Sequence, residues 1–266
     1  MSVDPQASSG SSAWPAGPWT EALTIVVPVH GRIDATLRFL ESWRPQTRAS
    51  HLVFVDDCSP DETVRVLREE GQVVVERGRL YFNGILNLAV AECRTTYLGV
   101  LNNDLVLGRR FVEQVLDAFE RSDSDFLVPC TLEEGLASPA DLERERRFRI
   151  RRLRRQQGWC MLFRTASVRR LPPVPADLRL WYGDSWLFHH AWEAGQKLGI
   201  LMHVPVIHQR HATIQSDATF RRTGVHPVLA EDERVFRERY GWIRTKRLGP
   251  WRFVPRWLRR KLVPFS

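Results

Sequence analysis

Long apolar runs are missing from this sequence. No stretch of about eighteen uninterrupted apolar residues occurs, which is the length that a helix needs to cross a membrane. Cysteine is scarce, and its four residues lie far apart without a CxxC pair: Cys58, Cys93, Cys130 and Cys160. This pattern favours neither a zinc site nor a disulfide framework. No secretory leader is recognisable, so we expect reduced thiols in the cytoplasm.

Positive charge is in excess. The 39 lysines and arginines outnumber 31 acidic residues, which gives a formal charge of +8 and a pI near 9.9. Such a balance favours nucleotides, nucleic acid or acidic lipid as partners. Eight arginines fall within 144–155, where a solvated helix face and an acceptor-side loop are both open explanations. The segment 246–266 mixes arginines with aromatic residues, as membrane-surface anchors do, and docking on the chain's own domain is the alternative.

Short β-branched apolar runs alternate with amphipathic stretches between residues 21 and 130. The runs, each expected to be a strand, are 23–29, 51–55, 72–76, 97–101 and 125–129. Four or five such repeats predict an α/β fold with a doubly wound sheet. Residues 1–20 are rich in Ser, Pro, Gly and Ala and predict a flexible segment ahead of the fold.

Local signals predict two helix starts and the later elements. Asp34 is expected to cap a first helix, and Ser59 is expected to cap a second helix that begins at Pro60. Beyond residue 130 the alternation lapses. There we expect an apolar segment at 159–163, a loop leading into a helix over 178–195, a strand pair over 197–208 and a helix over 226–240.

Two acidic clusters directly follow predicted strands. Asp56 and Asp57 come after 51–55, and Asp104 comes shortly after 97–101. Ligands in open parallel sheets bind at the carboxyl ends of the strands, so both clusters should share one rim. Helix capping and turn chemistry are the ordinary explanation for either cluster alone. Together they indicate carboxylates that bind a hard cation and contact a ribose or base, since Mg²⁺ commonly uses only one or two protein carboxylates.

Four blocks occur in order along the chain: "LTIVVPVHGR", "HLVFVDDCSPDET", "RGRLYFNGILNLAVAECRTTYLGVLNND" and "GWCMLF". In this order and spacing they resemble the motifs of the GT-A glycosyltransferases of family 2, over roughly residues 23–215. The resemblance implies a GT-A fold, which is Rossmann-like and doubly wound, with a mostly parallel sheet flanked by helices. It places the transferase domain at 21–245, with a nucleotide-binding half at 21–130 and an acceptor-binding half at 131–245.

The same resemblance implies a nucleotide-sugar donor bound at the strand ends. The residues that would hold it are Pro28, Val29, Asp56, Asp57, Arg79 and Asn87. One of the two aspartates would accept a hydrogen bond from the base. For Arg79 and Asn87, a surface arginine and a helix-face asparagine are equally open explanations.

The family's Asp-X-Asp metal motif matches Asn102-Asn103-Asp104. This implies that the two amides contact ribose or phosphate while Asp104 binds Mn²⁺ or Mg²⁺. The neutral Asn102 departs from the motif and lowers the negative charge. His208 matches a histidine that can complete the metal or diphosphate site, because a neutral imidazole is a suitable Mn²⁺ ligand. A structural histidine is the ordinary alternative.

The family's catalytic base, an aspartate that follows a glutamate at the head of a helix, corresponds to Asp184, with Gly183 in place of the glutamate. A carboxylate opposite the leaving nucleotide can take the proton of the attacking hydroxyl, which implies inversion. An ordinary helix cap is the alternative. Four aromatic residues are candidates for acceptor contact: Trp159, Trp181, Tyr182 and Trp186.

Three functions therefore compete. The first is an inverting, metal-dependent transferase that uses a nucleotide sugar and a glycan, lipid-linked or other glycoconjugate acceptor, in the cytoplasm or at the inner face of the membrane. The second, a nucleic-acid-binding protein, rests on charge and on interleaved Arg and Trp, and we find no nucleic-acid motif and expect no nucleic-acid partner. The third, a sugar nucleotidyltransferase, requires a glycine-rich phosphate loop, of which "VPVHGR" is a poor version.

Overall fold

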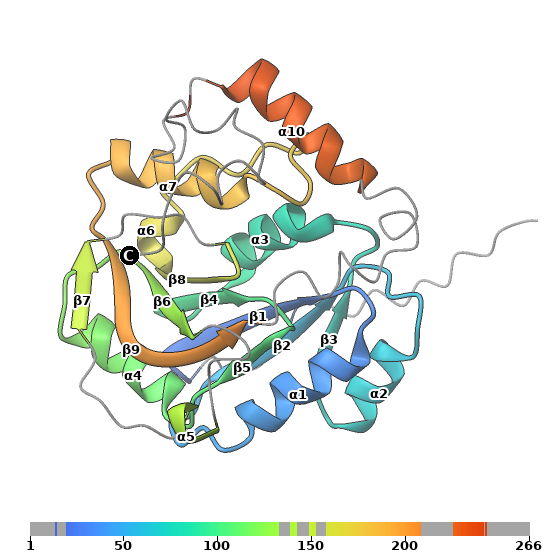
Figure 1. Ribbon diagram of the computed structural model, residues 1–266, viewed down its shortest axis with the longest axis vertical. Coiled ribbons are helices and arrows are strands. Elements are labelled where there is room, and N and C mark those ends of the chain that lie inside the picture. Colours follow the sequence, from blue (N-terminus) through green and yellow to red (C-terminus); the bar gives the residue numbers. More distant parts are fainter. Residues whose placement is uncertain are drawn as a thin grey trace, which may run out of the picture.

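The computed structural model describes residues 14, 20–132, 139–142, 149–152, 158–208, 226–241 and 243. A nine-stranded sheet runs in the order β3-β2-β1-β4-β8-β6-β9-β5, and β7 also pairs with β9 (Figure 1). The strands are β1 (Leu23–Val29), β2 (His51–Asp56), β3 (Val73–Glu76), β4 (Tyr97–Leu101), β5 (Leu105–Leu107), β6 (Phe126–Leu132), β7 (Arg149–Arg152), β8 (Cys160–Arg164) and β9 (Leu198–His208). The described helices are α1 (Ile33–Trp43), α2 (Thr63–Glu69), α3 (Tyr81–Glu92), α4 (Phe111–Glu120), α5 (Pro139–Leu142), α6 (Thr165–Val168), α7 (Gly183–Glu193) and α10 (Pro227–Tyr240).

The first half of the sheet is parallel. β1 pairs with β2 and β4, and β2 pairs with β3, each in parallel. Parallel neighbours need crossover connections, and α1, α2 and α3 provide them. The carboxyl ends of these strands consequently meet at one edge, where the register sets Val29 beside Asp56.

The second half contains antiparallel strands. β8 is antiparallel to both β4 and β6, and β9 is parallel to β6 but antiparallel to β5 and β7. The strand pair predicted over 197–208 is wrong, because β9 is one strand of 11 residues. It pairs with β6 across a register shift, because Pro129 faces Leu201 whereas Thr131 faces Val206, and the extra residues of this irregularity lie in β9.

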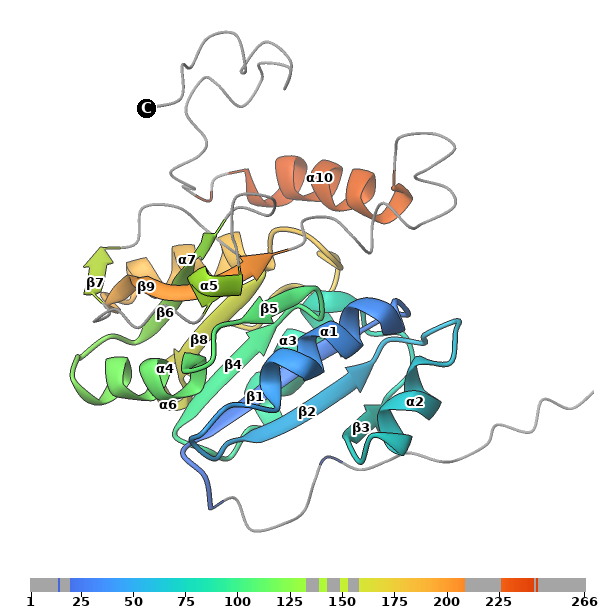
Figure 2. The same ribbon diagram turned by 60° about the horizontal axis from the view of Figure 1, so that its bottom comes forward.

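Helices cover both faces of the sheet, which confirms the predicted α/β class. Figure 1 shows α3, α7 and α10 on one side and α1, α2 and α4 on the other, and Figure 2 again shows α10 outside α7. The first core, on the side of α1, α2 and α4, includes Phe39, Leu67 and Phe119. The second core, on the side of α3, α7 and α10, includes Ile85 and Phe236. All five side chains are fully buried, so the helices that carry them, α1, α2, α3, α4 and α10, are each held by an apolar face.

The start of α2 differs from the prediction. The helix begins at Thr63 rather than at Pro60, and the Ser59 hydroxyl accepts a hydrogen bond from the Gly31 N–H at 2.8 Å instead of capping it. Asp61 Oδ1 accepts a hydrogen bond from the Thr63 N–H at 3.1 Å. The predicted serine cap is therefore wrong, because the loop after β1 competes for the same hydroxyl.

The start of α1 also differs. Asp34 lies within the first turn of α1, and the residue preceding the helix is Arg32, in a left-handed conformation with φ 61°. Arg32 Nε donates to Asp34 Oδ1 at 2.9 Å. That hydrogen bond is the main reason why the pKa of Asp34 falls to about 2. The predicted capping role of Asp34 is therefore wrong.

The described part of the basic run is a strand. Arg149–Arg152 form β7, in which Arg149 and Arg151 are exposed while Ile150 packs against the first core. A period of two places alternate residues on opposite faces, so the helix-face explanation is wrong for these residues. The rest of 144–155 and the segment 246–266 lie outside the described residues.

Trp14 differs from the flexible segment expected at residues 1–20. Its side chain is 6% exposed and belongs to the second core. Burial of a large indole removes apolar area from water, which holds the chain at this residue. The other residues of 1–19 lie outside the described part of the chain.

Two further facts concern membranes and thiols. Among the described residues, no helix has the length and apolar character needed to cross a membrane. All four cysteines are free thiols, and Cys58 is exposed. Burial raises the pKa of the Cys160 thiol well above its usual range.

Candidate active site

The acidic pair lies beside the end of β1. Pro28 and Val29 occupy the last two positions of that strand, and the Asp57 N–H donates to the Val29 carbonyl at 2.8 Å. Asp56 and Asp57 are both buried. Both carboxylate oxygens of Asp56 lie 3.2 Å from the Ser59 N–H. The structure therefore brings together the four residues expected to hold the nucleotide at these two strand ends.

Asp57 organises the start of α3. Its Oδ1 accepts hydrogen bonds from the N–H groups of Leu80 and Tyr81, each at 2.7 Å. Its Oδ2 lies 3.3 Å from Arg79 Nε, and Arg79 Nη1 donates to the Asp57 carbonyl at 3.0 Å. The Arg79 guanidinium also lies over the Tyr81 ring, 4.6 Å from its centroid, and contacts the imidazole of His30. Arg79 is thus held at the rim as a cation beside the acidic pair.

The amides of the 102–104 segment hold neighbouring elements. The Asn102 N–H donates to the Trp159 carbonyl at 2.9 Å. Asn103 is buried, and its Nδ2 donates to Thr36 Oγ1 at 2.9 Å. The predicted contact of Asn103 with ribose or phosphate therefore competes with a hydrogen bond that ties the segment to α1, while Asn102 stays partly exposed.

Asp104 faces His208. The register pairs Leu105 with His208, which sets Asp104 Oδ1 3.4 Å from His208 Nε2. Asp104 is 5% exposed, and its Oδ1 is buried without a hydrogen-bond partner. The Trp159 ring stacks on the imidazole, with centroids 5.3 Å apart. These contacts hold a carboxylate and an imidazole in one place.

The residues at this position fit a divalent cation. A buried carboxylate oxygen without a hydrogen bond is costly, and a bound cation would satisfy it. Asp104 and His208 offer an oxygen and a nitrogen ligand, which suit Mn²⁺, and Mg²⁺ also needs few protein ligands. In the described part of the chain, no group of three or more Asp, Glu, His and Cys is arranged to bind a metal. The remaining ligands would have to be substrate phosphates and water.

Arg32 is a residue of this site that the sequence analysis missed. Its guanidinium has a raised pKa, chiefly through the hydrogen bond to Asp34, and the charge of Asp104 contributes. A cation therefore lies within electrostatic reach of the Asp104–His208 pair. Its position immediately after the first strand loop, in "HGR", is the signal that could have indicated it.

Asp184 approaches the same region from α7. A side-chain carbon added to Gly158 would lie 3.4 Å from Asp184 Cγ and 3.5 Å from Oδ2, so the carboxylate lies against the backbone before β8. Gly158 precedes Trp159, which stacks on His208. Asp184 Oδ1 also accepts a hydrogen bond from the Ser185 N–H at 2.7 Å. The chain of contacts thus runs from the predicted base to the predicted metal ligands.

The start of α7 explains the departure at Gly183. The residue preceding α7 is Tyr182, in a left-handed conformation with φ 66° and without a side-chain cap, so Asp184 lies inside the first turn rather than capping it. A Cβ atom added to Gly183 would lie 2.0 Å from Asn83 Oδ1. No side chain fits there without movement, which accounts for the missing glutamate.

The candidate acceptor aromatics lie in different surroundings. Trp181 is 41% exposed. Tyr182 stacks on Phe236 of α10 with centroids 4.1 Å apart, and Trp186 Nε1 donates to the Pro172 carbonyl at 3.0 Å. The rings of Tyr182 and Trp186 thus contribute to packing of the fold. Trp181 presents an exposed ring.

Asn87 is bound away from the acidic pair. Its Nδ2 donates to the Val174 carbonyl at 2.8 Å, and its Oδ1 accepts from the Val174 N–H at 2.9 Å. These bonds match the helix-face explanation.

Two other residues with structural importance were missed, Asn83 and Asp232, both of which are fully buried. For Asp232 a signal existed, because it falls with Leu229 on the apolar face of a predicted helix.

An α/β sheet with an acidic pair at the parallel strand ends and a carboxylate–imidazole pair is the arrangement that the resemblance to the GT-A class predicts. The model of glycosyl transferase family 2 matches residues 24–170. The chain belongs to this family. No curated protein matches the chain.

Solved structures share the fold at low identity. The chain is similar to GalNAc-T7 with UDP, GalNAc and Mn²⁺ (TM-score 0.61, 14% identity, 84% of this chain and 49% of that one). It is similar to the mannosyltransferase PcManGT from Pyrobaculum calidifontis with GDP-Man and Mn²⁺ (TM-score 0.55, 15% identity, 86% and 75%). It is also similar to residues 1–349 of S. aureus TarS with UDP (TM-score 0.53, 14% identity, 68% and 59%). The chain thus spans about half to three fifths of GalNAc-T7 and TarS.

The family match and the similar structures confirm the predicted family and the GT-A fold. Family membership favours the transferase over the nucleotidyltransferase, which the weak phosphate loop already disfavoured. The match ends at residue 170, so Asp184, His208 and Asp232 all lie beyond it. The roles of these residues therefore rest on the geometry of the site.

Proposed function

We propose that the chain is an inverting, divalent-cation-dependent glycosyltransferase that moves a sugar from a nucleoside diphosphate to a glycan, a lipid-linked glycan or another glycoconjugate. Family membership supports the reaction class. The structures of GalNAc-T7 with UDP, GalNAc and Mn²⁺ and of PcManGT with GDP-Man and Mn²⁺ support the donor class and the cation. The observation that carries the proposal is the continuity from Asp184 through Gly158 and Trp159 to the Asp104–His208 pair.

Asp184 acts as the general base. Its carboxylate, at the head of α7, takes the proton from the acceptor hydroxyl while that oxygen attacks the anomeric carbon. The nucleotide leaves on the opposite face, so the configuration at that carbon inverts. The exposed ring of Trp181, three residues before the base, offers a flat apolar surface to a sugar.

The donor side uses the strand ends. Asp56 accepts from the base of the nucleotide, since among the described residues its carboxylate accepts only from the Ser59 N–H. Asp57, by contrast, accepts from two N–H groups of α3 and its approach and pairs with Arg79. Arg32 and Arg79 provide positive charge toward the diphosphate, which becomes more negative as the glycosidic bond to it breaks. A Mn²⁺ or Mg²⁺ ion held by Asp104 and His208 would supply further charge neutralisation when bound.

Calorimetric titration tests this proposal. Purified protein is titrated with UDP, GDP, CDP and dTDP, each with Mn²⁺ and again with EDTA. We expect micromolar binding of one nucleotide in Mn²⁺, that is, about −8 kcal/mol, and much weaker binding in EDTA. Absence of binding by all four nucleotides, together with salt-sensitive oligonucleotide binding, would favour the nucleic-acid alternative.

The cellular location proposed with this function is the cytoplasm, with the basic aromatic segment 246–266 contacting the inner face of the membrane. Co-sedimentation with vesicles of phosphatidylcholine, with and without phosphatidylserine, tests the contact. Binding that requires phosphatidylserine and weakens with salt supports it. Equal recovery of the protein in the supernatant in both cases contradicts it.

A further inference from the structure

Residues 178–181 form the loop that leads into α7, and Asn83 holds this 178–181 loop on one side. Asn83 Nδ2 donates to the carbonyls of Leu178 and Trp181 at 3.0 and 2.9 Å, and its backbone N–H donates to the Arg179 carbonyl at 2.9 Å. Asn83 is fully buried in α3. Three carbonyls of the loop are thus fixed from the nucleotide-binding half of the domain.

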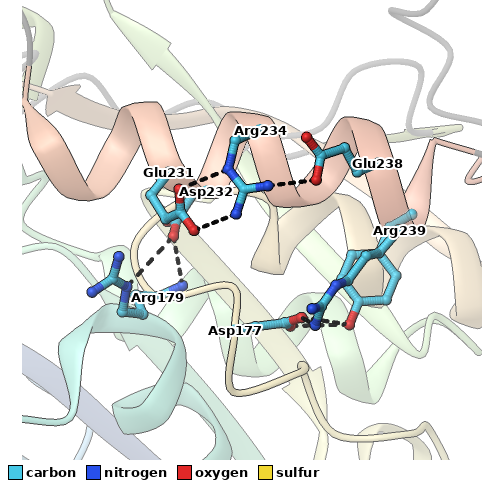
Figure 3. Close-up of polar contacts among 8 residues, drawn as sticks. Asp177, Arg179, Glu231, Asp232, Arg234, Glu238 and Arg239 are labelled. Atoms are coloured by element: carbon cyan, nitrogen blue, oxygen red, sulfur yellow. Dashed lines mark hydrogen bonds and ion pairs between the residues drawn. The ribbon is translucent and has the colours of Figure 1, made fainter.

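Asp232 of α10 holds the other side of the same loop. Its Oδ1 accepts from the Arg179 N–H at 3.0 Å, and its Oδ2 accepts from the N–H groups of Leu180 and Trp181 at 2.6 and 2.8 Å. Figure 3 shows the carboxylate directed at the backbone and side chain of Arg179. Asp232 is fully buried, and a buried carboxylate that accepts several N–H groups is strongly oriented by them.

The neighbouring charges of α10 behave differently. Arg234 pairs with Glu231 and Glu238 along the exposed surface of the helix, and Figure 3 shows these pairs apart from the loop. Asp177 accepts hydrogen bonds from the side chains of Arg239 and Tyr240, which joins the same two segments without touching a loop amide. Docking of α10 therefore does not by itself require a buried carboxylate at position 232.

The loop controls where Asp184 lies. Its last residue, Trp181, is followed by the left-handed Tyr182, then by Gly183, where an added Cβ would lie 2.0 Å from Asn83 Oδ1. Asp184 comes next, so only Tyr182 and the closely packed Gly183 separate it from the held backbone. A base displaced by about 1 Å can lose on the order of a hundredfold in rate.

We infer that Asp232 and Asn83 are positioning residues that set the base Asp184 and the ring of Trp181 by fixing the 178–181 loop. The inference rests on the proposed role of Asp184. Asp232 touches no substrate and acts through the loop amides, so its loss should lower turnover while leaving donor binding unchanged. Asparagine at 232 can accept through only one oxygen, which leaves at least one of the three amides facing an amino group.

The test compares Asp232→Asn with Asp177→Asn, a matched change in a carboxylate that contacts α10 but no loop amide. Asn83→Ala independently removes the side-chain hydrogen bonds on the other side of the loop, and it serves as the second variant if the substitution of buried Asp232 prevents folding. Thermal unfolding establishes that each variant is folded. Hydrogen exchange, followed by mass spectrometry on peptides covering 178–184, reports on the loop without any substrate.

Turnover is measured as hydrolysis of UDP-glucose, UDP-N-acetylglucosamine, GDP-mannose and dTDP-rhamnose in Mn²⁺, using the donor that the wild-type protein hydrolyses fastest. We expect Asp232→Asn and Asn83→Ala to speed exchange over 178–184 and to lower kcat about tenfold or more, with donor KM within about twofold. Asp177→Asn should leave exchange at 178–184 and kcat unchanged.

Several outcomes overturn the inference. Unchanged exchange over 178–184 in both Asp232→Asn and Asn83→Ala shows that the loop is held by other contacts. Equal effects of Asp177→Asn and Asp232→Asn reduce the role of Asp232 to docking of α10. Asp184→Asn separates the two proposals. If its kcat is unchanged, the assignment of Asp184 as base fails. If its kcat falls while Asp232→Asn and Asn83→Ala keep full turnover, only the positioning role is overturned.

Discussion

Asp104 Oδ1 and His208 Nε2 lie 3.4 Å apart, and Asp104 immediately precedes β5 while His208 ends β9. The antiparallel pairing of Leu105 with His208 sets this distance. Two residues that are 104 positions apart in the sequence are thereby joined by a backbone ladder rather than by flexible side chains. A cation bound between them would need little reorganisation of the protein.

Asp104→Ala should weaken nucleotide binding only when the cation is present. We expect about a tenfold or larger loss of affinity in Mn²⁺ and no change in EDTA, because a metal ligand contributes only through the metal. Calorimetric titration with the nucleotide that binds the wild-type protein measures both. Asp123→Asn, an exposed carboxylate paired with Lys197, is the control. Unchanged affinity of Asp104→Ala in Mn²⁺ would remove Asp104 from the metal site.

Asp184→Asn should separate binding from chemistry. The amide keeps the size of the carboxylate but cannot accept the acceptor proton, so we expect transfer or donor hydrolysis to fall by about a hundredfold to ten-thousandfold. Nucleotide affinity should stay within about twofold, because such a loss belongs to the transition state. Initial rates and calorimetry on the same preparation provide the comparison. A variant with full transfer activity means that another group is the base.

Gly183→Ala should destabilise the protein through a single contact. The new methyl group would lie 2.0 Å from Asn83 Oδ1, and relief of such overlap typically costs about 1–3 kcal/mol. Urea unfolding of Gly183→Ala, Asn83→Ala and the double variant forms a cycle. Since Asn83→Ala removes the overlapping amide, the double variant should lose less stability than the two single variants combined. Strict additivity would show that the two residues do not meet.

His190 should make stability depend on pH below neutrality. Burial lowers the pKa of His190, the neighbouring His189 adds to the shift, and Glu193 opposes it. Because the folded pKa lies below the unfolded value, the unfolded state binds more protons. The contribution is therefore fully present above the unfolded pKa of about 6.5 and is lost as pH falls through that value toward the folded one.

The matching measurement is urea unfolding at several pH values between about 7.5 and 5. His190→Gln should flatten the fall in the free energy of unfolding over this range, whereas substitution of the exposed Glu238 should not. If the two variants and the wild-type protein follow parallel curves, His190 does not titrate differently on unfolding.

The sequence predicts strands well where periodicity is strong. The runs that became β1, β2, β3, β4 and β6 were each located to within a few residues, since a run of buried β-branched residues carries its own signal. β5 has three residues and was missed because so short a strand has no period. Ser59 was misjudged because its hydroxyl is used by Gly31, 28 residues away.

The candidate site also contains residues that the sequence could predict and residues that it could not. Asp56, Asp57 and Asp104 could be predicted because strand ends are local features. The environment of Asp184 could not, since it depends on Asn83 and Asp232, which approach from two other helices. Asp232 could be seen in the sequence as a polar residue on the apolar face of α10. Its partners could not, because they are backbone N–H groups, which every residue type except proline has.

The fixing of the 178–181 loop by Asn83 and Asp232 also has a consequence for the order of folding. Asn83 meets Trp181 across 98 residues, and Asp232 meets Arg179 across a further 53. Contacts of such separation form after local ones because loop closure must precede them. During synthesis, the strand ends proposed to bind nucleotide can assemble well before α10 has left the ribosome. A nascent chain would then be able to hold a donor before it is able to use one.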